Sequence, residues 1–307
     1  MKLIIRPLFL LLCCAALLCA PAVHASQEPL SIVCTIFPAY DFARQLAGDT
    51  AQVTLLLPPG GDCHSYEPSP RDIIRIQEAD LFLYGGGESD HWVEEILSSM
   101  GDDAPRAFRL ADCVTLLAEE TTESMEAHHE EAEMDEHVWT SPKNAMRIVK
   151  DLSAALCEIA PENADAYGAA LTGYLGELEA LDAAFEETVA QGKRDLIVFG
   201  DRFPFRYFAH DYHLRYDAAF PGCSEDSEPS VRTVISLVET VRAEQVPVIF
   251  YIEFSSRKTA DILAEETGAK ELLFHSCHNV SSEELEAGAT YLTLMWNNVS
   301  ALKEALS

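Results

Sequence analysis

Residues 161–191 read PENADAYGAALTGYLGELEALDAAFEETVAQ, and this stretch decides the fold. Its apolar side chains recur mostly every three or four positions, which predicts one amphipathic helix. Pro161 at the start and Gly192 just past the end are typical helix boundaries. At 1.5 Å per residue, about 30 residues form a rod of about 45 Å. We expect this rod to join two lobes and to allow little hinge motion between them.

Strand and helix patterns alternate on both sides of this long helix. Apolar, β-branched runs that predict strands lie at 30–37, 53–57, 80–84, 196–199, 215–218, 248–252 and 271–275. A single final helix is expected at about 287–306. A βα repeat predicts mainly parallel sheets with helices on their faces. The sequence therefore indicates an α/β protein with an N-terminal lobe at 26–160, a linking helix at 161–191 and a C-terminal lobe at 192–307.

The first 25 residues have the layout of a secretory signal. Lys2 and Arg6 precede an apolar run that is shorter than the roughly 20 residues needed to span a bilayer, and Val23-His24-Ala25 resembles a cleavage site. We expect cleavage after Ala25, and a mature chain in the periplasm or at the outer face of the cytoplasmic membrane. The alternative is processing at Cys19, which would leave a lipid anchor on that residue.

The chain is strongly acidic, with 51 Asp and Glu against 21 Lys and Arg, for a formal charge of −30. Removal of the signal, which carries basic residues but no acidic ones, makes the charge more negative. Such a charge argues against nucleic acid and anionic membrane surfaces as partners and favours cations. Acidity also keeps an exported protein soluble, and this simpler reason explains most of it.

Six cysteines follow the expected signal. Export places them in an oxidising compartment, where an even number of cysteines can form disulfides. The pairing cannot be read from spacing alone. We favour Cys223 with Cys277, because both are expected on loops that follow strands of the same lobe.

Two short segments each deliver a histidine from a loop that precedes a helix. They read GDCHSYEPSP at 61–70 and DEHVWTSP at 135–142. His64 follows a predicted strand through a turn rich in proline and glycine, and ligands of open α/β sheets bind beyond the carboxyl ends of the strands. Neutral imidazoles are good ligands for zinc and also bind manganese, nickel or copper. His64 and His137 together predict capture of one divalent metal ion in the cleft between the lobes.

The overlapping runs 63–72 and 137–145 resemble the first and second metal-ligand motifs of the zinc/manganese-type (cluster A-I) periplasmic solute-binding proteins of ABC transporters. Further segments similar to this family follow in the same order at 207–214, 228–230, 249–253 and 291–295. The likeness covers essentially the whole chain after the signal. It implies two βα lobes joined by one backbone helix, a metal in the cleft, and delivery to a membrane permease with a cytoplasmic ATPase. We expect a monomer.

The chain departs from this family at the third and fourth ligands. The third, usually His or Glu, falls here on Arg202, whose guanidinium stays protonated and cannot ligate. A turn shifted by one residue would let Asp201 coordinate instead; without that shift, Arg202 pairs with a carboxylate and the site loses a ligand. The fourth, commonly Asp, falls nearest to Ser276. His275 and His278 flank that position, so we expect a third imidazole from one of these two histidines.

A site rich in nitrogen favours zinc over manganese. Three imidazoles with one carboxylate or water suit tetrahedral zinc, whereas manganese prefers more oxygen ligands and higher coordination. Thiolate from Cys63 or Cys277 is an alternative that export disfavours, because it promotes their oxidation. Glu67, Asp201 and Glu253 are candidates for the anionic surroundings of the ion, and Glu253 is equally compatible with a satisfied core acid.

An acidic, histidine-containing loop at 118–137 lies between the two motifs. Residues 119–137 hold nine carboxylates, His128 and His129, and no Lys or Arg. Such a composition cannot bury a core, so we expect a mobile, solvated segment. We favour a weak zinc collector beside the cleft; the alternative is a loop that only promotes solubility.

Three other functions are compatible with these residues. A manganese-specific binding protein of the same type would use the same cleft. A secreted zinc-dependent hydrolase would need an open coordination position and a general base, such as Glu67 or Asp201. A metal store or chaperone without a transporter would bind several ions. The chain lacks both the His-Glu-x-x-His and the Gly-x-Ser-x-Gly motif, so we expect binding without catalysis.

Overall fold

The computed structural model describes residues 28–63, 65–125, 133–222 and 228–307. The signal expected at 1–25, with the alternative anchor Cys19, lies outside these residues. Within the described ranges, no helix combines the length and the apolar character that a membrane crossing requires.

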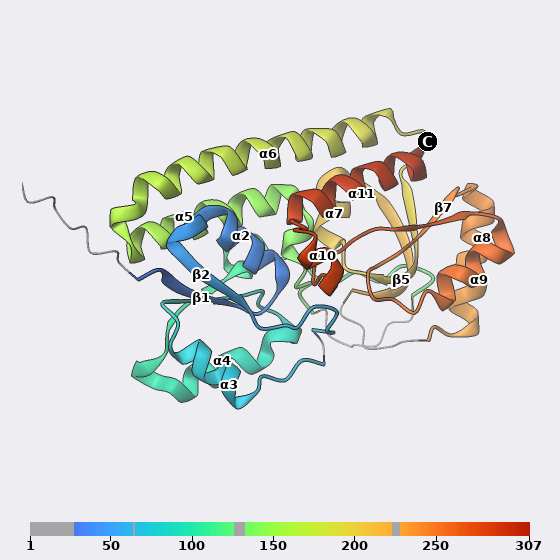
Figure 1. Cartoon of the computed structure of the whole chain (residues 1–307). Helices are drawn as coiled ribbons and strands as arrows, with labels where there is room; N and C mark the ends of the chain where they lie inside the picture. The colour runs from blue at the N-terminus through green and yellow to red at the C-terminus, as the bar shows by residue number, and fades with distance from the viewer. Residues whose placement is uncertain (1–27, 64, 126–132, 223–227) are drawn as a thin grey trace, which may run out of the picture.

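The first lobe is built on a four-stranded parallel sheet with the order β2-β1-β3-β4. The strands are β1 Leu30–Cys34, β2 Ala51–Leu55, β3 Leu81–Tyr84 and β4 Arg106–Arg109. The helices are α2 Phe37–Ala47, α3 Pro70–Gln77, α4 His91–Met100 and α5 Pro142–Ile159 (Figure 1). Ile32 belongs to the core formed with α2 and α5, whereas Val33 clusters with residues of α3 and α4. Strands that are apolar on both faces require helices on both faces.

The second lobe repeats this topology in a sheet with the order β6-β5-β7-β8, again with parallel pairs. Its strands are β5 Leu196–Phe203, β6 Arg215–Pro221, β7 Val248–Tyr251 and β8 Lys270–Leu273. Its helices are α7 Arg206–Tyr212, α8 Val231–Glu244, α9 Lys258–Thr267, α10 Ser282–Glu286 and α11 Tyr291–Leu306. Neighbouring residues of β5 face opposite cores, with Phe199 in the cluster that contains α7 and α11 and Val198 in the cluster with α8 and α9. The predicted fold class, two βα lobes with parallel sheets, is confirmed.

The long helix predicted from the sequence is α6, Ala164–Gln191, preceded by a short 3-10 turn at Pro161–Asn163. It runs along one side of both lobes, over α2 and α5 at one end and over α7 and α11 at the other (Figure 1). Its buried side chains form the predicted stripe and include Tyr167, Tyr174, Leu178, Leu181 and Phe185. A 28-residue helix is about 42 Å long, so a single rigid element supports both lobes.

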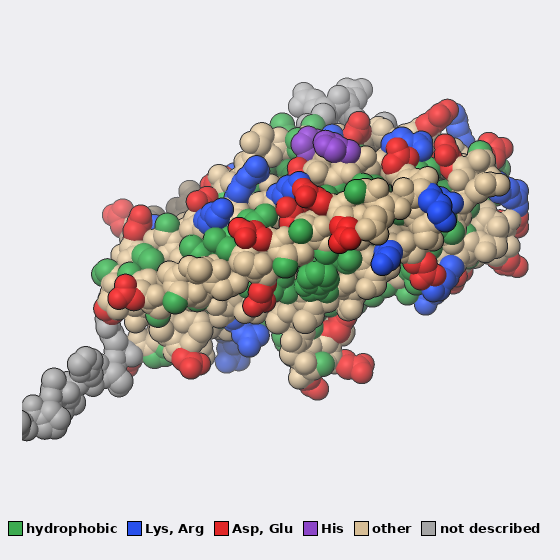
Figure 2. All heavy atoms as spheres, turned by 90° about the horizontal axis from the view of Figure 1, so that it is seen from above, with side chains coloured by type: hydrophobic (Ala, Val, Ile, Leu, Met, Phe, Trp, Pro, Cys, Tyr) green, Lys and Arg blue, Asp and Glu red, His purple; other side chains and the backbone are tan. Residues whose placement is uncertain are grey.

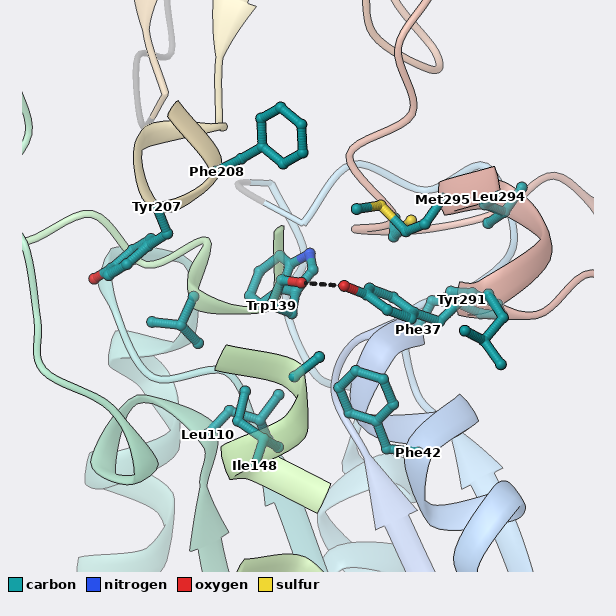
Figure 3. Packing of buried hydrophobic residues seen from close by; sticks show 14 of the residues in the cluster. Phe37, Phe42, Leu110, Trp139, Ile148, Tyr207, Phe208, Tyr291, Leu294 and Met295 are labelled. Atoms are coloured by element: carbon teal, nitrogen blue, oxygen red, sulfur yellow. Dashed lines mark hydrogen bonds between the residues drawn. The ribbon is translucent and has the colours of Figure 1, made fainter. Parts of the chain in front are cut away.

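One hydrophobic core continues from the first lobe through α6 into the second. Where the lobes meet, the indole nitrogen of buried Trp139 donates a hydrogen bond to the Ser276 carbonyl at 2.9 Å. The Tyr291 hydroxyl donates to the Trp139 carbonyl at 2.8 Å (Figure 3). The Tyr291 ring also packs edge-on against Phe42, with 5.0 Å between the ring centroids. Residues far apart in the chain are therefore held against one another at the junction of the lobes.

Two elements of the structure were not predicted. Strand β4 was not expected, because its sequence Arg-Ala-Phe-Arg is charged at both ends; as an edge strand, it exposes its first two residues. The final helix, expected from about residue 287, is α11 and begins at Tyr291 after its cap Thr290; the short helix α10 before it was not predicted, and Gly288, with a positive φ of 78°, lies between the two. A positive φ is accessible to glycine at little cost, so the chain can turn there.

The outer face along α6 is solvated and mixed in charge. Figure 2, seen from above the view in Figure 1, shows acidic and basic side chains interspersed over this face. Lys143 at the start of α5 pairs with Glu186 of α6 at 2.8 Å. Exposed pairs of this kind contribute little to stability, so the buried stripe holds α6 in place.

The loop after β8 is held by a buried histidine between two acids. The Nε2 atom of His275 lies 3.7 Å from the Glu284 carboxylate, and its Nδ1 atom lies 3.6 Å from Glu253. Burial alone would lower the pKa of His275, but Glu253 and Glu284 raise it above its ordinary value. The His275 ring, together with Ser281 at the start of α10, lowers the pKa of Glu284 to about 2. The imidazolium form therefore links this loop to α10.

We expect Glu284→Gln to destabilise the protein mainly between pH 4.5 and 6.5, the ordinary pKa values of the two groups. Below the ordinary His275 value the imidazolium is formed, and the stabilisation is lost as pH rises through its raised pKa. Above the ordinary Glu284 value the carboxylate is formed, and the stabilisation is lost as pH falls towards its lowered pKa. Glutamine preserves the cap on Ser281, so the change tests the charge.

The loss should be about 1 kcal/mol for this partly exposed pair, or about 2–4 °C in thermal unfolding of a chain of this size. Glu283→Gln, at an exposed neighbour in the same helix, is the control and should change nothing. An equal destabilisation at alkaline pH would contradict the ion-pair explanation.

Candidate metal centre

A cavity of about 340 Å³ opens at the carboxyl ends of the strands, between the two lobes. The first lobe lines it with the turn before α3 and the loop before the 3-10 turn Val138–Thr140; the second lobe lines it with the ends of β5, β7 and β8. Its polar lining residues include Asp62, Cys63, His137, Asp201, Arg202, Glu253, Ser276 and His278. This is the place where open α/β sheets bind ligands.

His137 is buried and is held by Asp135. The Asp135 carboxylate accepts a hydrogen bond from the His137 backbone N–H at 2.8 Å and lies 3.3 Å from the ring Nδ1. Tyr207 of α7 donates its hydroxyl proton to the Asp135 carbonyl at 2.7 Å, which ties this loop to the second lobe. Burial lowers the pKa of His137, but the charge and hydrogen bond of Asp135, together with the charges of Glu136 and Glu119, raise it above its ordinary value. An acid on one ring nitrogen orients a histidine so that the other nitrogen can ligate a metal.

The structure brings His278 to His137. Their ring centroids lie 5.4 Å apart with the planes nearly perpendicular, and the His278 ring packs against Trp139 at 4.9 Å. The Nδ1 atom of His278 lies 3.4 Å from the Cys63 sulfur. The backbone of His278 is fixed as well, because its N–H donates to the Ser276 hydroxyl at 3.2 Å. Two imidazoles, one from each lobe, therefore line the same cavity.

His275, the alternative to His278, does not line this cavity. In the neutral ring, Nδ1 accepts the Cys277 backbone N–H at 2.9 Å; Nε2 faces Glu284 in either protonation state. The two histidines, three positions apart, thus have different surroundings. Only His278 adjoins His137.

His64, the first predicted ligand, lies outside the described residues. Cys63, directly before it, lines the cavity. The side-chain amide of Asn279 donates to the carbonyls of Pro58 and Gly61 at 2.8 and 2.9 Å, so the loop after β8 also holds the turn that leads to His64. Within the ranges that the structure describes, no three His, Cys, Asp or Glu side chains are placed to hold one ion.

Asp201 and Arg202 both line the cavity at the end of β5. The pairing of β5 with β6 shifts register between Phe199 and Arg202, at the turn where a shift of one residue would let Asp201 coordinate. The Asp201 carboxylate accepts the backbone N–H groups of Arg202 at 2.8 Å and Ile252 at 3.3 Å. Burial raises the pKa of Asp201. Its oxygens therefore organise the backbone of this turn.

The other candidate acids have different places. Glu253 accepts hydrogen bonds from the Ser276 hydroxyl at 2.5 Å and the Ser276 N–H at 2.8 Å, so it fixes the loop after β8. Glu67 is exposed and is not among the residues that line the cavity, so its expected place around the ion is wrong. Sequence reasoning missed Asp135, although its position two residues before His137 was an available signal.

The two cysteines that were candidate metal ligands, Cys63 and Cys277, have different surroundings. Cys277 is fully buried outside the cavity lining, and its predicted disulfide partner Cys223 lies outside the described residues. Cys63 lines the cavity, and burial raises the pKa of its thiol, which favours the neutral form. The neutral thiol is a weaker metal ligand than the thiolate.

The acidic loop is packed where the structure describes it. Thr122 and Ser124 donate hydrogen bonds to the buried Asp217 carboxylate at 2.5 and 2.7 Å, and Met125 is buried. The expectation of an unpacked segment is wrong for these residues. His128 and His129 lie outside the described part of the chain.

Comparison with known proteins agrees with this architecture. The family model described as ZnuA, zinc-uptake complex component A, periplasmic, matches residues 32–305. The zinc-binding lipoprotein AdcA of Streptococcus pneumoniae is 32% identical over 297 residues, which cover 95% of this chain and 59% of that protein. The high-affinity zinc uptake system protein ZnuA of Bacillus subtilis is 32% identical over 291 residues, which cover 91% of this chain and 88% of that protein.

A solved structure gives the same result. The crystal structure of the Zn(II)-bound ZnuA-like domain of Streptococcus pneumoniae AdcA superposes with a TM-score of 0.77 at 31% identity, covering 91% of this chain and 99% of that one. This chain thus spans 59% of the length of the first relative and nearly all of its ZnuA-like domain. The family match over residues 32–305, together with these likenesses, shows that the chain belongs to the ZnuA family of periplasmic zinc-uptake components.

Proposed function

We propose that this protein is an extracytoplasmic solute-binding protein that captures one zinc ion between its lobes and delivers it to an ABC permease. The observation that carries this proposal is the meeting of His137 and His278, from different lobes, in one cavity at the carboxyl ends of the strands. The names of the relatives, which refer to zinc binding and zinc uptake, support zinc as the cargo.

We assign the imidazoles of His64, His137 and His278 as ligands. His64 belongs to the set through its sequence motif and the position of Cys63 at the cavity. His275 does not belong to it, because its nitrogens face Cys277 and Glu284. Three imidazoles leave one position of a tetrahedral zinc ion open to a further oxygen. Manganese would be held less well, because it prefers more oxygen ligands.

An open position on zinc is also what a hydrolase requires, so the general base decides between the two functions. Two of the three acids that line the cavity bond to backbone amides: Asp201 to those of Arg202 and Ile252, and Glu253 to that of Ser276; the third, Asp62, is exposed. Acids engaged in this way are poorly placed to activate water. We therefore infer binding without turnover, and one ion per chain in place of storage.

Delivery requires a partner in the membrane. We propose a permease with a cytoplasmic ATPase, which the monomeric protein would meet in the periplasm or at the outer face of the cytoplasmic membrane. Export through residues 1–25 supports this location. The helix α6 and the residues Trp139 and Tyr291 hold the lobes together. We therefore expect the release of zinc to need only small movements of the loops that carry the proposed ligands.

The ligand set predicts which histidines matter. His64→Ala, His137→Ala and His278→Ala should each weaken zinc binding by about 100-fold or more, because each removes one of three nitrogen donors. His275→Ala should keep tight binding. Isothermal titration of metal-free protein with zinc, and separately with manganese, measures this. The exposed His210→Ala is the matched control. Tight binding retained in His278→Ala but lost in His275→Ala would contradict the assignment.

Asp135 should tune the affinity of His137 for zinc. Asp135→Asn keeps an oxygen acceptor for the His137 backbone but removes the charge beside its ring, so zinc affinity should fall by about 10–100-fold. Competition with a chromophoric chelator measures the affinity, and thermal unfolding of the metal-free variant checks the fold. Asp102→Asn, at an exposed site, is the control. An unchanged affinity in a folded Asp135→Asn variant would show that the charge has no such role.

A further inference from the structure

The acidic loop pairs with itself just before His137. Residues 117–119 run antiparallel to 133–135, and two backbone hydrogen bonds of 2.7 and 2.9 Å join them. We call residues 117–125 and 133–135 the clasp. Its last residue, Asp135, carries the carboxylate that lies 3.3 Å from Nδ1 of the His137 ring. The clasp therefore ends on the acid that orients a proposed zinc ligand.

The second lobe holds both segments of the clasp through one hydroxyl group. The hydroxyl of Tyr207, on α7 (Figure 3), accepts the Leu117 N–H at 3.2 Å and donates to the Asp135 carbonyl at 2.7 Å. The neighbouring Arg206 pairs with Glu120 of the clasp at 3.1 Å. Tyr207 is buried, and a hydrogen bond is stronger where the local dielectric is low. The backbone of Asp135 is thus held by a side chain of the opposite lobe.

A second anchor holds the far end of the clasp. Buried Asp217 lies on β6, the edge strand of the second sheet, and accepts the hydroxyls of Thr122 at 2.5 Å and Ser124 at 2.7 Å. The Ser124 hydroxyl also lies 2.8 Å from that of Ser236 on α8. Met125 beside it is buried. Hydrogen bonds to a carboxylate are stronger than those between neutral groups, so this end is fixed to the second lobe.

The clasp reaches the proposed zinc site through Asp135. The N–H and the carbonyl of this residue are bonded to Leu117 and Tyr207, and its carboxylate accepts the His137 N–H at 2.8 Å. A residue fixed at both backbone groups has little freedom to move its carboxylate away from the ring. Groups behind a metal-bound histidine fix its orientation and tune its affinity for the metal.

We propose that the clasp is the device by which the second lobe positions His137 for zinc, with Tyr207 as the positioning residue and Asp217 as the anchor. The inference rests on the proposed function and uses only His137 among the proposed ligands. Tyr207 does not touch the ion; it holds Asp135, and Asp135 holds the ring. When the clasp is loosened, the His137 ring leaves the ion more readily, so zinc dissociates faster.

Tyr207→Phe tests the positioning role, because it removes the hydroxyl and keeps the ring in the core. Zinc dissociation should become about three- to tenfold faster, as measured by stopped-flow mixing of the zinc-loaded full chain with excess chromophoric chelator. Tyr212→Phe is the matched control, since Tyr212 lies on the same helix and its hydroxyl donates to Asp182 of α6 at 2.7 Å, outside the clasp. The control should lose a comparable hydrogen bond and leave the dissociation rate unchanged.

A double-mutant cycle tests the route from Tyr207 to the ion. If Tyr207 acts through Asp135, Tyr207→Phe should change the dissociation rate much less in an Asp135→Asn background than in the unmodified chain. A purely structural contribution of the hydroxyl would give the same change in both backgrounds.

Amide hydrogen exchange of the metal-free protein provides a measurement that does not involve zinc. Exchange at 117–119 and 133–137 should be faster in Tyr207→Phe and in Ser124→Ala, which weakens the anchor at Asp217. Ser124→Ala should also speed zinc dissociation, so it decides the proposal if Tyr207→Phe does not fold. Ser99→Ala is its control, because the exposed Ser99 hydroxyl bonds within α4.

The outcomes separate the two proposals. An unchanged dissociation rate in folded Tyr207→Phe would overturn the positioning role, as would an equal acceleration in Tyr212→Phe or additive effects in the cycle. Unchanged exchange at 117–119 and 133–137 in both clasp variants would overturn the clasp itself. Failure of the unmodified, folded chain to bind zinc would overturn the proposed function, whereas the exchange measurement would still report whether Tyr207 and Asp217 hold the clasp.

Discussion

The contact between Trp139 and the loop after β8 is the constraint on which the rest of the structure depends. Its indole N–H bonds to the Ser276 carbonyl, its carbonyl accepts from Tyr291, and its ring packs on His278. Trp139 lies two residues after His137 and packs on His278, so this one residue joins the lobes beside the two histidines that line the cavity. A ligand pair held by a buried core loses little conformational freedom when an ion binds.

The acidic side chains around the cavity have different structural roles. Asp135 orients His137, whereas Asp201 and Glu253 accept backbone N–H groups and shape the loops after β5 and β8. A buried acid that satisfies backbone donors stabilises a loop that has no strand partner. The overall negative charge of the chain attracts cations from a distance, whereas selection of zinc in the proposed site would rest on nitrogen donors. Acidity and ligation are therefore different properties of this protein.

The periodic pattern of apolar residues predicted most of the helices and strands, because each element must bury its apolar side chains in the core. The stripe of α6 follows from its packing on both lobes, and the apolar strands follow from sheets covered on both faces. Strand β4 was not predicted because an edge strand needs few apolar residues and so lacks the apolar pattern that marks a strand. The short helix α10 was not predicted, and the start of α11 was placed a few residues early, because the turn at Gly288 depends on a local backbone angle. At the candidate site, His137 could be found from its motif, but the role of Asp135 required the folded distance.

The amino-acid sequence by itself determined the fold class, the long linking helix and the kind of chemistry, because repeating apolar patterns and histidine-bearing loops are local properties of the chain. Only the tertiary structure shows that His278, and not His275, lines the cavity, since both lie on the same short loop and differ in what surrounds them. The same holds for Asp201, Arg202 and Glu253, whose roles depend on backbone groups brought from other strands. Packing between distant segments sets the direction of a side chain, and that information is absent from residue spacing.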